Sequence, residues 1–379
     1  MSDSQIPAKA EHLPCPLSHL LLALIAVTPA VITVPPNLNI VLTAAIAVWV
    51  GSKRSVKDTP PEESMTRTDA LKFPLVGSAV LFGLFITFKI LPKHLVNLVL
   101  AGYFALLGVL ALTATLLPFI EHICSARVKK LSYTAPKFSV PSWLSKEPVE
   151  ISVTAPELAG ALLSLFFCIW PVECCRYFAE KHWLANNVLG LAFSVQGIEH
   201  LSLGAVSTGV ILLSGLFFYD IFWVFCTPVM VSVAKSFDAP IKLLFPRAVE
   251  EGSKLTPFSM LGLGDIVIPG IFVALVLRYD VLHNAKYFRS AYSGYVTGLG
   301  TTIVIMNVFE AAQPALLYIV PAVLAAVLGH AALNKEFNEV FHFSESKEKD
   351  DEDAQESSKP SEQSDNVSAK LSTQSKKSS

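Results

Sequence analysis

Two aspartates lie alone in long apolar stretches of this 379-residue sequence. Asp220 is the only Asp, Glu, Lys, Arg or His from 201 to 234, and Asp265 is the only one from 255 to 277. A charged side chain at the centre of a membrane helix costs at least about 2.5–3.5 kcal/mol. Two such residues on consecutive apolar segments therefore indicate a functional site. Either residue alone could instead form a structural hydrogen bond between helices.

The two aspartates can be compared in depth. Pro228 lies eight residues after Asp220, and Pro257 lies eight residues before Asp265. These prolines could mark the two helix ends beside the 231–256 loop. With a rise of 1.5 Å per residue, both carboxyl groups would then lie about 12 Å below the same face of the membrane. Antiparallel neighbouring helices would then bring the carboxyl groups level, and a shared site is predicted.

Two carboxyl groups in contact hold one proton between them, as in aspartic proteases. The ionised carboxylate can deprotonate a water that attacks a peptide carbonyl, while the protonated group hydrogen-bonds the carbonyl oxygen. This chemistry requires no metal, nucleophilic serine or cofactor, and none is predicted. The six cysteines form no CxxC pair and no Cys/His ligand spacing, so neither a metal site nor a disulfide framework is expected.

Residues beside the acids could support this chemistry. Gly262 and Gly264 permit close backbone approach, although small residues also serve helix packing. The hydroxyl of Tyr219 could orient the neighbouring carboxyl or simply belong to a core aromatic. Pro314, at the start of the last apolar segment, frees backbone groups that could hydrogen-bond an extended peptide.

The composition argues against a chain of soluble domains. Hydrophobic residues make up 52% of the sequence and charged residues 16%, against about 25% charged in an average soluble chain. The net charge of −2, with no basic stripe interleaved with aromatics, argues against a nucleic-acid partner. The lipid bilayer is the expected surrounding.

Apolar windows of about 20 residues predict an all-α polytopic membrane protein with nine spans. The first window, 17–50, is broken by prolines at 29, 35 and 36. It could be one broken segment, a short lead before a span at about 31–50, or a cleaved signal, and a retained span is favoured. The other windows are 73–91, 95–118, 156–175, 184–203, 205–230, 257–278, 291–311 and 314–333.

The parts outside these windows differ in character. Residues 1–16 are expected in the lumen, 17–335 form the membrane domain, and the polar, charged segment 336–379 is expected to be a disordered cytosolic tail. Five Lys or Arg in 51–72 and five in 119–155 support this orientation. The 231–256 loop argues against this orientation, because it is predicted on the lumenal side and yet carries four basic residues.

The last residues add support for a cytosolic tail. Lys376 and Lys377 are followed by two serines that end the sequence. This is the dilysine pattern that retrieves membrane proteins to the endoplasmic reticulum, and it is read from the cytosol. Localisation in the endoplasmic reticulum membrane is therefore predicted.

Three motifs occur together and in order: Tyr219-Asp220, Gly262-Leu263-Gly264-Asp265 and Gln313-Pro314-Ala315-Leu316. On the sixth, seventh and ninth spans, they resemble those of the intramembrane aspartyl proteases, and the chain resembles signal peptide peptidases, plant-type members included, more than presenilins. The resemblance covers roughly residues 30–345. It implies nine spans, a lumenal N-terminus, self-association without a fixed stoichiometry, and cleavage of signal-peptide remnants and other type II membrane helices. The predicted site has Asp220 and Asp265 as catalytic residues, supported by Tyr219, Gly262, Leu263, Gly264, Gln313, Pro314, Ala315 and Leu316.

The sequence also offers a rival function and three further acidic or basic residues in or beside the spans. A proton-coupled transporter or channel also places acids on facing helices, and it is the rival function, although it usually has an inverted repeat that is not visible here. Glu199 and His200 lie where two spans meet, and a solvated turn is expected there. Glu310, inside the eighth span, is expected to extend toward the membrane interface, with a contact near the acids as the alternative.

Overall fold

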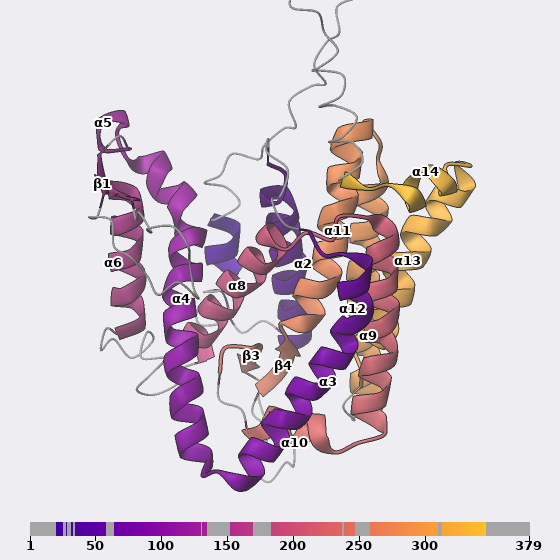
Figure 1. The fold of residues 1–379 in the computed structure, drawn as a ribbon, viewed down its shortest axis with the longest axis horizontal. Coiled ribbons are helices and arrows are strands. Elements are labelled where there is room, and N and C mark those ends of the chain that lie inside the picture. Colours follow the sequence, from indigo (N-terminus) through magenta and orange to yellow (C-terminus); the bar gives the residue numbers. More distant parts are fainter. Residues whose placement is uncertain are drawn as a thin grey trace, which may run out of the picture.

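A computed structural model of the protein (Figure 1) describes residues 20–25, 28, 32, 35–57, 64–129, 131–134, 152–169, 183–236, 239–246, 258–309 and 313–345. The predicted lumenal residues 1–16, Glu310, and the dilysine pair Lys376 and Lys377 lie outside these ranges.

The described part of the chain is mainly helical. The long helices are α2 (Pro36–Arg54), α3 (Arg67–Ile90), α4 (Lys93–Ile123), α6 (Ala155–Ile169), α8 (Trp183–His200), α9 (Val206–Phe225), α11 (Gly264–His283), α12 (Tyr287–Phe309) and α13 (Leu316–Leu333). The short helices are α5 (Ala126–Lys129), α10 (Val229–Ser236) and α14 (Phe337–His342). Two antiparallel hairpins pair β1 (Ser132–Thr134) with β2 (Ser152–Thr154), and β3 (Lys242–Pro246) with β4 (Phe258–Gly262).

Each predicted membrane window overlaps one of the long helices, and the predicted all-α polytopic class is confirmed. Five of the described helices, α3, α4, α9, α11 and α13, are long and apolar enough to cross a membrane. The count of nine spans stays a prediction. The first window contains helical residues at 20–25 and then α2, which begins at Pro36, since proline is favoured at the first position of a helix.

The core is centred on α11, which packs against α2, α8, α9, α12 and α13. From Pro269 to Asp280 every residue of α11 is buried. By contrast, α3, α4 and α6 expose large apolar side chains such as Leu75, Leu106 and Leu162. An apolar outer surface of this extent is expected where helices face lipid.

The predicted window 257–278 begins with a strand and not with a helix. β4 pairs with β3 from Phe258 opposite Pro246 to Gly262 opposite Lys242, and α11 starts only at Gly264. The expectation that Asp265 lies eight helical residues from Pro257 is therefore wrong. Two glycines one residue apart disfavour a helix, and the partner strand 242–246 offers the hydrogen bonds instead.

The start of the predicted disordered tail also differs from the structure. Residues 337–342 form α14, and Val340 and Phe343 are buried. Glu345 forms an ion pair with Arg278 of α11, with 2.5 Å between Oε1 and Nε, and both side chains are about 10% exposed. Ala205, just before α9, pairs with Ser344 in a β-bridge. This segment is ordered because its apolar side chains reach the core, a contact that its charged composition does not reveal.

Glu199 does not lie in a solvated turn. It is in the last turn of α8, its side chain is 11% exposed, and its Oε2 lies 2.6 Å from Nε of Arg54 in α2. The Arg54 guanidinium also donates to the carbonyl oxygens of Ala114 and Thr115 in α4. The prediction of a solvated turn is wrong for Glu199. Its ion-pair partner, Arg54, lies on a helix far away in the sequence, and the local sequence does not reveal it.

Candidate active site

Asp220 lies on the buried side of α9 and is 5% exposed. Its Oδ2 accepts a hydrogen bond from the backbone N–H of Leu316, at 3.0 Å. Leu316 is the first residue of α13, and the first four N–H groups of a helix have no acceptor within that helix. The carboxylate of α9 therefore acts as a cap for α13, which the helix dipole favours.

Asp265 lies in the first turn of α11 and is half-buried. Asp220 and Asp265 lie on α9 and α11, two helices that pack against each other, and their carboxyl groups are within electrostatic range. The two predicted acids thus come from separate, neighbouring helices. A pair of neighbouring carboxyl groups that share one proton can act as acid and base toward a peptide bond.

The Gly-Leu-Gly segment before Asp265 joins the β3–β4 hairpin to α11. A Cβ added at Gly262 would lie 3.3 Å from Oδ2 of Asp265, so a side chain there would crowd the carboxyl group. The Leu263 N–H continues the strand pairing by donating to the Ile241 carbonyl at 2.9 Å. A Cβ at Gly264 would meet nothing within 4 Å, so the space beside Gly264 is open.

The Pro-Ala-Leu tripeptide is held in place by α12. Pro314, Ala315 and Leu316 are buried, and Gln313 is half-buried. The hydroxyl of Thr302 in α12 lies 3.4 Å from the Ala315 carbonyl oxygen. Thr302 was not predicted as a site residue, because threonine in an apolar helix carries no distinctive signal.

Two glycines of α12 allow this close approach to α13. A Cβ at Gly294 would lie 2.8 Å from the Ala322 carbonyl oxygen, and one at Gly298 would lie 2.7 Å from the Ile319 Cα. Both distances are shorter than real contacts allow. The Gly-x-x-x-Gly spacing is a known signal for close helix packing in membranes, and it could have revealed this contact from the sequence.

Tyr219 turns its ring toward α3. A Cβ at Gly77 would lie 3.7 Å from the Tyr219 ring, and the ring lies against Trp223, with 6.3 Å between centroids. The Trp223 indole N–H donates to Ser78 of α3 at 3.0 Å. Tyr219 thus helps to fix α9 against α3, and its hydroxyl remains near enough to Asp220 for an electrostatic interaction.

Two buried asparagines of α8 hold the β3–β4 hairpin. The Asn187 side chain exchanges two hydrogen bonds with the backbone of Leu244, both at 2.7 Å. Asn186 donates to the Lys242 carbonyl, also at 2.7 Å. One edge of β3 is therefore occupied by α8 and the other by β4. Two adjacent amides in an apolar helix were a signal for such a role.

Comparison with known proteins gives consistent matches. The family model described as signal peptide peptidase matches residues 57–347. The chain is 43% identical over 325 residues to the signal peptide peptidase of Homo sapiens, which covers 82% of this chain and 84% of that protein. The mouse protein of the same name is 44% identical over the same length. Signal peptide peptidase-like 1 of Oryza sativa is 28% identical over 365 residues, covering 81% of this chain and 92% of that protein.

Proposed function

Because the chain belongs to the signal peptide peptidase family and is an intramembrane aspartic protease, we propose that Asp220 and Asp265 are its two catalytic residues. The observation that carries this proposal is that the two acids lie on packed helices, with Asp220 accepting a hydrogen bond from the Leu316 N–H and Asp265 in the first turn of α11. The Gly-Leu-Gly and Pro-Ala-Leu segments thereby become parts of one active site.

In the proposed reaction one carboxyl group is ionised and the other is protonated. The ionised group takes a proton from water, and the water oxygen attacks the peptide carbonyl carbon. The protonated group donates a hydrogen bond to the carbonyl oxygen, where negative charge develops. Transfer of a proton to the amide nitrogen then lets the C–N bond break, which releases an amine and a carboxylic acid.

The substrate enters as an extended strand in this proposal. A membrane helix hides its carbonyl groups in hydrogen bonds within the helix, so several residues must unwind before attack. The freed backbone groups then need partners. The second edge of β4, the open space at Gly264 and the backbone around Pro314 are suited to receive them by strand addition. Both edges of β3 are occupied, by α8 and by β4, so β3 itself is not the receiving strand.

The proposed substrates are signal-peptide remnants, as the name of the human relative suggests, and other type II membrane helices, as the resemblance of the motifs implies. We place the protein in the endoplasmic reticulum membrane, with a lumenal N-terminus and a cytosolic C-terminus. Five basic residues in each of 51–72 and 119–155, together with Lys376 and Lys377, support this orientation. Self-association is a further part of the proposal and rests on the family alone.

Inhibition tests the proposed chemistry. A peptide in which a hydroxyl group replaces the scissile amide resembles the tetrahedral intermediate and should inhibit cleavage of a labelled type II helix by the purified protein in lipid vesicles. Serine-directed reagents and metal chelators should leave the rate unchanged. Inactivation by a chelator at modest concentration would count against the proposal. Proton flux without cleavage would instead favour the rival transporter.

A further inference from the structure

Tyr295 carries a buried hydroxyl group that none of the described residues satisfies. The side chain is 0% exposed, and its Oη has no hydrogen-bond partner in the described part of the chain. Buried polar atoms nearly always have a partner, and an unpaired one costs free energy. Phenylalanine would fill the same volume without this cost, so the hydroxyl group calls for an explanation.

The neighbouring tyrosines of α12 differ in this respect. Tyr292, three residues earlier on the same helix, donates its hydroxyl to the Ala45 carbonyl at 3.1 Å. Tyr287 donates to the Glu336 carboxylate. Of these three tyrosines of α12, Tyr295 is the one whose hydroxyl has no partner among the described residues.

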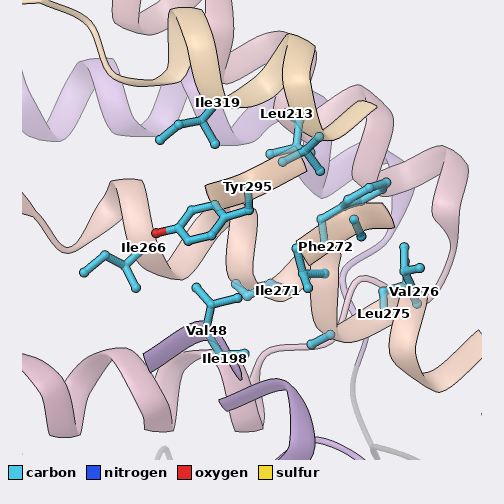
Figure 2. Packing of buried hydrophobic residues seen from close by; sticks show 14 of the residues in the cluster. Val48, Ile198, Leu213, Ile266, Ile271, Phe272, Leu275, Val276, Tyr295 and Ile319 are labelled. Carbon is cyan, nitrogen blue, oxygen red and sulfur yellow. The ribbon is translucent and has the colours of Figure 1, made fainter. Parts of the chain in front are cut away.

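The ring of Tyr295 lies in the apolar cluster that surrounds α11. Figure 2 shows its hydroxyl pointing toward Ile266, the residue that follows Asp265, and both residues belong to one buried cluster. Asp265 and Ile266 both belong to the first turn of α11. The phenol thus points to the turn of α11 that carries Asp265.

The two aspartates differ in their hydrogen bonds to the described residues. Asp220 accepts a hydrogen bond from Leu316, whereas no residue in the described ranges donates one to the Asp265 carboxyl group. Among the described residues, the Tyr295 hydroxyl thus lacks an acceptor, and the carboxyl group in the turn to which it points lacks a donor. A hydrogen bond from a hydroxyl to a carboxylate is among the stronger kinds in proteins.

We propose that Tyr295 is a positioning residue, whose hydroxyl donates a hydrogen bond to the Asp265 carboxyl group when that group turns toward it in the substrate-bound site. The bond fixes the orientation of Asp265 toward Asp220 and the attacked carbonyl, as Leu316 fixes Asp220. It satisfies the buried phenol at the same time. This inference rests on the proposed function, since it acts through Asp265.

The test compares Tyr295→Phe with Tyr292→Phe, which removes the same atom one turn away. The purified proteins are reconstituted in lipid vesicles, and kcat, KM and Tm are measured with one labelled type II helix. For Tyr295→Phe we expect kcat to fall about 10-fold to 100-fold, the range for a hydrogen bond to a charged group. KM should stay within about twofold, and Tm should not fall, because no bond of the resting structure is lost.

Tyr292→Phe should behave in the opposite way: it breaks the bond to Ala45, so Tm falls while kcat is kept. A wild-type kcat in Tyr295→Phe would overturn the proposal, and so would a failure of that variant to fold, because an unpaired hydroxyl is dispensable for folding. Asp265→Ala separates the two hypotheses. If it is inactive while Tyr295→Phe is fully active, only the role of Tyr295 is wrong; if it is active, the proposed function itself is wrong.

Discussion

The backbone N–H of Leu316 donates to the Asp220 carboxylate at 3.0 Å, which joins the first turn of α13 to the C-terminal half of α9. The bond links one of the two proposed catalytic acids to a backbone group whose position is set by a third helix, since α13 packs on α12 through Gly294 and Gly298. The distance between α12 and α13 should therefore control the orientation of the Asp220 carboxyl group, although Asp220 itself lies on α9.

Gly298→Val should lower both activity and stability. A Cβ at this position would lie 2.7 Å from the Ile319 Cα, which is backbone and must move. The shift displaces the start of α13 and with it the donor to Asp220, and overpacking of this kind costs about 1–3 kcal/mol. Cleavage rate and Tm of the reconstituted protein provide the measurement.

The matched control is Gly300→Val, two residues further along the same helix. A Cβ at Gly300 would meet nothing within 4 Å, so this variant should cleave at the wild-type rate. Equal losses in both variants would mean that valine harms α12 in general and that the contact with α13 has no special role.

Asn187→Ala should loosen the β3–β4 hairpin. It removes both hydrogen bonds to the Leu244 backbone, and each buried group left unpaired costs about 1–3 kcal/mol. Because β4 runs directly into the segment before Asp265, cleavage should slow as well as Tm fall. Asn338→Ala, at an exposed position of α14, is the control and should change neither. An unchanged cleavage rate in Asn187→Ala would show that the hairpin does not support the site.

Glu345→Ala tests the contact of the C-terminal segment with α11. It leaves the Arg278 guanidinium nearly buried without its carboxylate, and removing one partner of a buried ion pair costs about 3–5 kcal/mol. A thermal melt should show a large fall in Tm, whereas Glu339→Ala, at an exposed position of α14, should shift it little. A fall no larger than that of the control would mean that the ion pair does not hold this segment.

Sequence reasoning singled out the two aspartates for a physical reason. Asp220 and Asp265 each stand alone in a long apolar stretch, where an ionisable side chain is costly and therefore informative. The structure places Gly262 against the Asp265 carboxyl group, and the role of Gly262 and Gly264 in the site stays a prediction. Such signals are local, and they can be read without knowing which helices meet.

The contacts that complete the site come from distant parts of the chain. Asn187 and Leu244 are 57 residues apart, and the local sequence around either residue does not indicate that the two are in contact. Residues 258–262 form a strand only because 242–246 lie beside them. In the sequence Tyr295 looks like any core aromatic, and only the structure shows that its hydroxyl has no partner within the described ranges. Pairings of this kind depend on the tertiary fold and leave little trace in local patterns.

Substrate unwinding predicts a selectivity for weak helices. One type II segment with a central Gly–Ser pair should be cleaved faster than the same segment with Leu–Leu, because glycine and serine favour the helix less than leucine does. The rates are compared at equal expression and equal membrane insertion. Equal rates for the two segments would contradict local unwinding as the selective step.

The most direct measurement is the cleavage rate of a labelled type II helix by the Asp220→Ala and Asp265→Ala variants, reconstituted and checked for folding by Tm. Both carboxyl groups are required when they share one proton, so each single variant should lose all detectable cleavage. Each should remain folded, since removing a buried acid takes away a desolvation cost. A folded single variant that retains more than a few per cent of the wild-type rate would contradict the two-aspartate site.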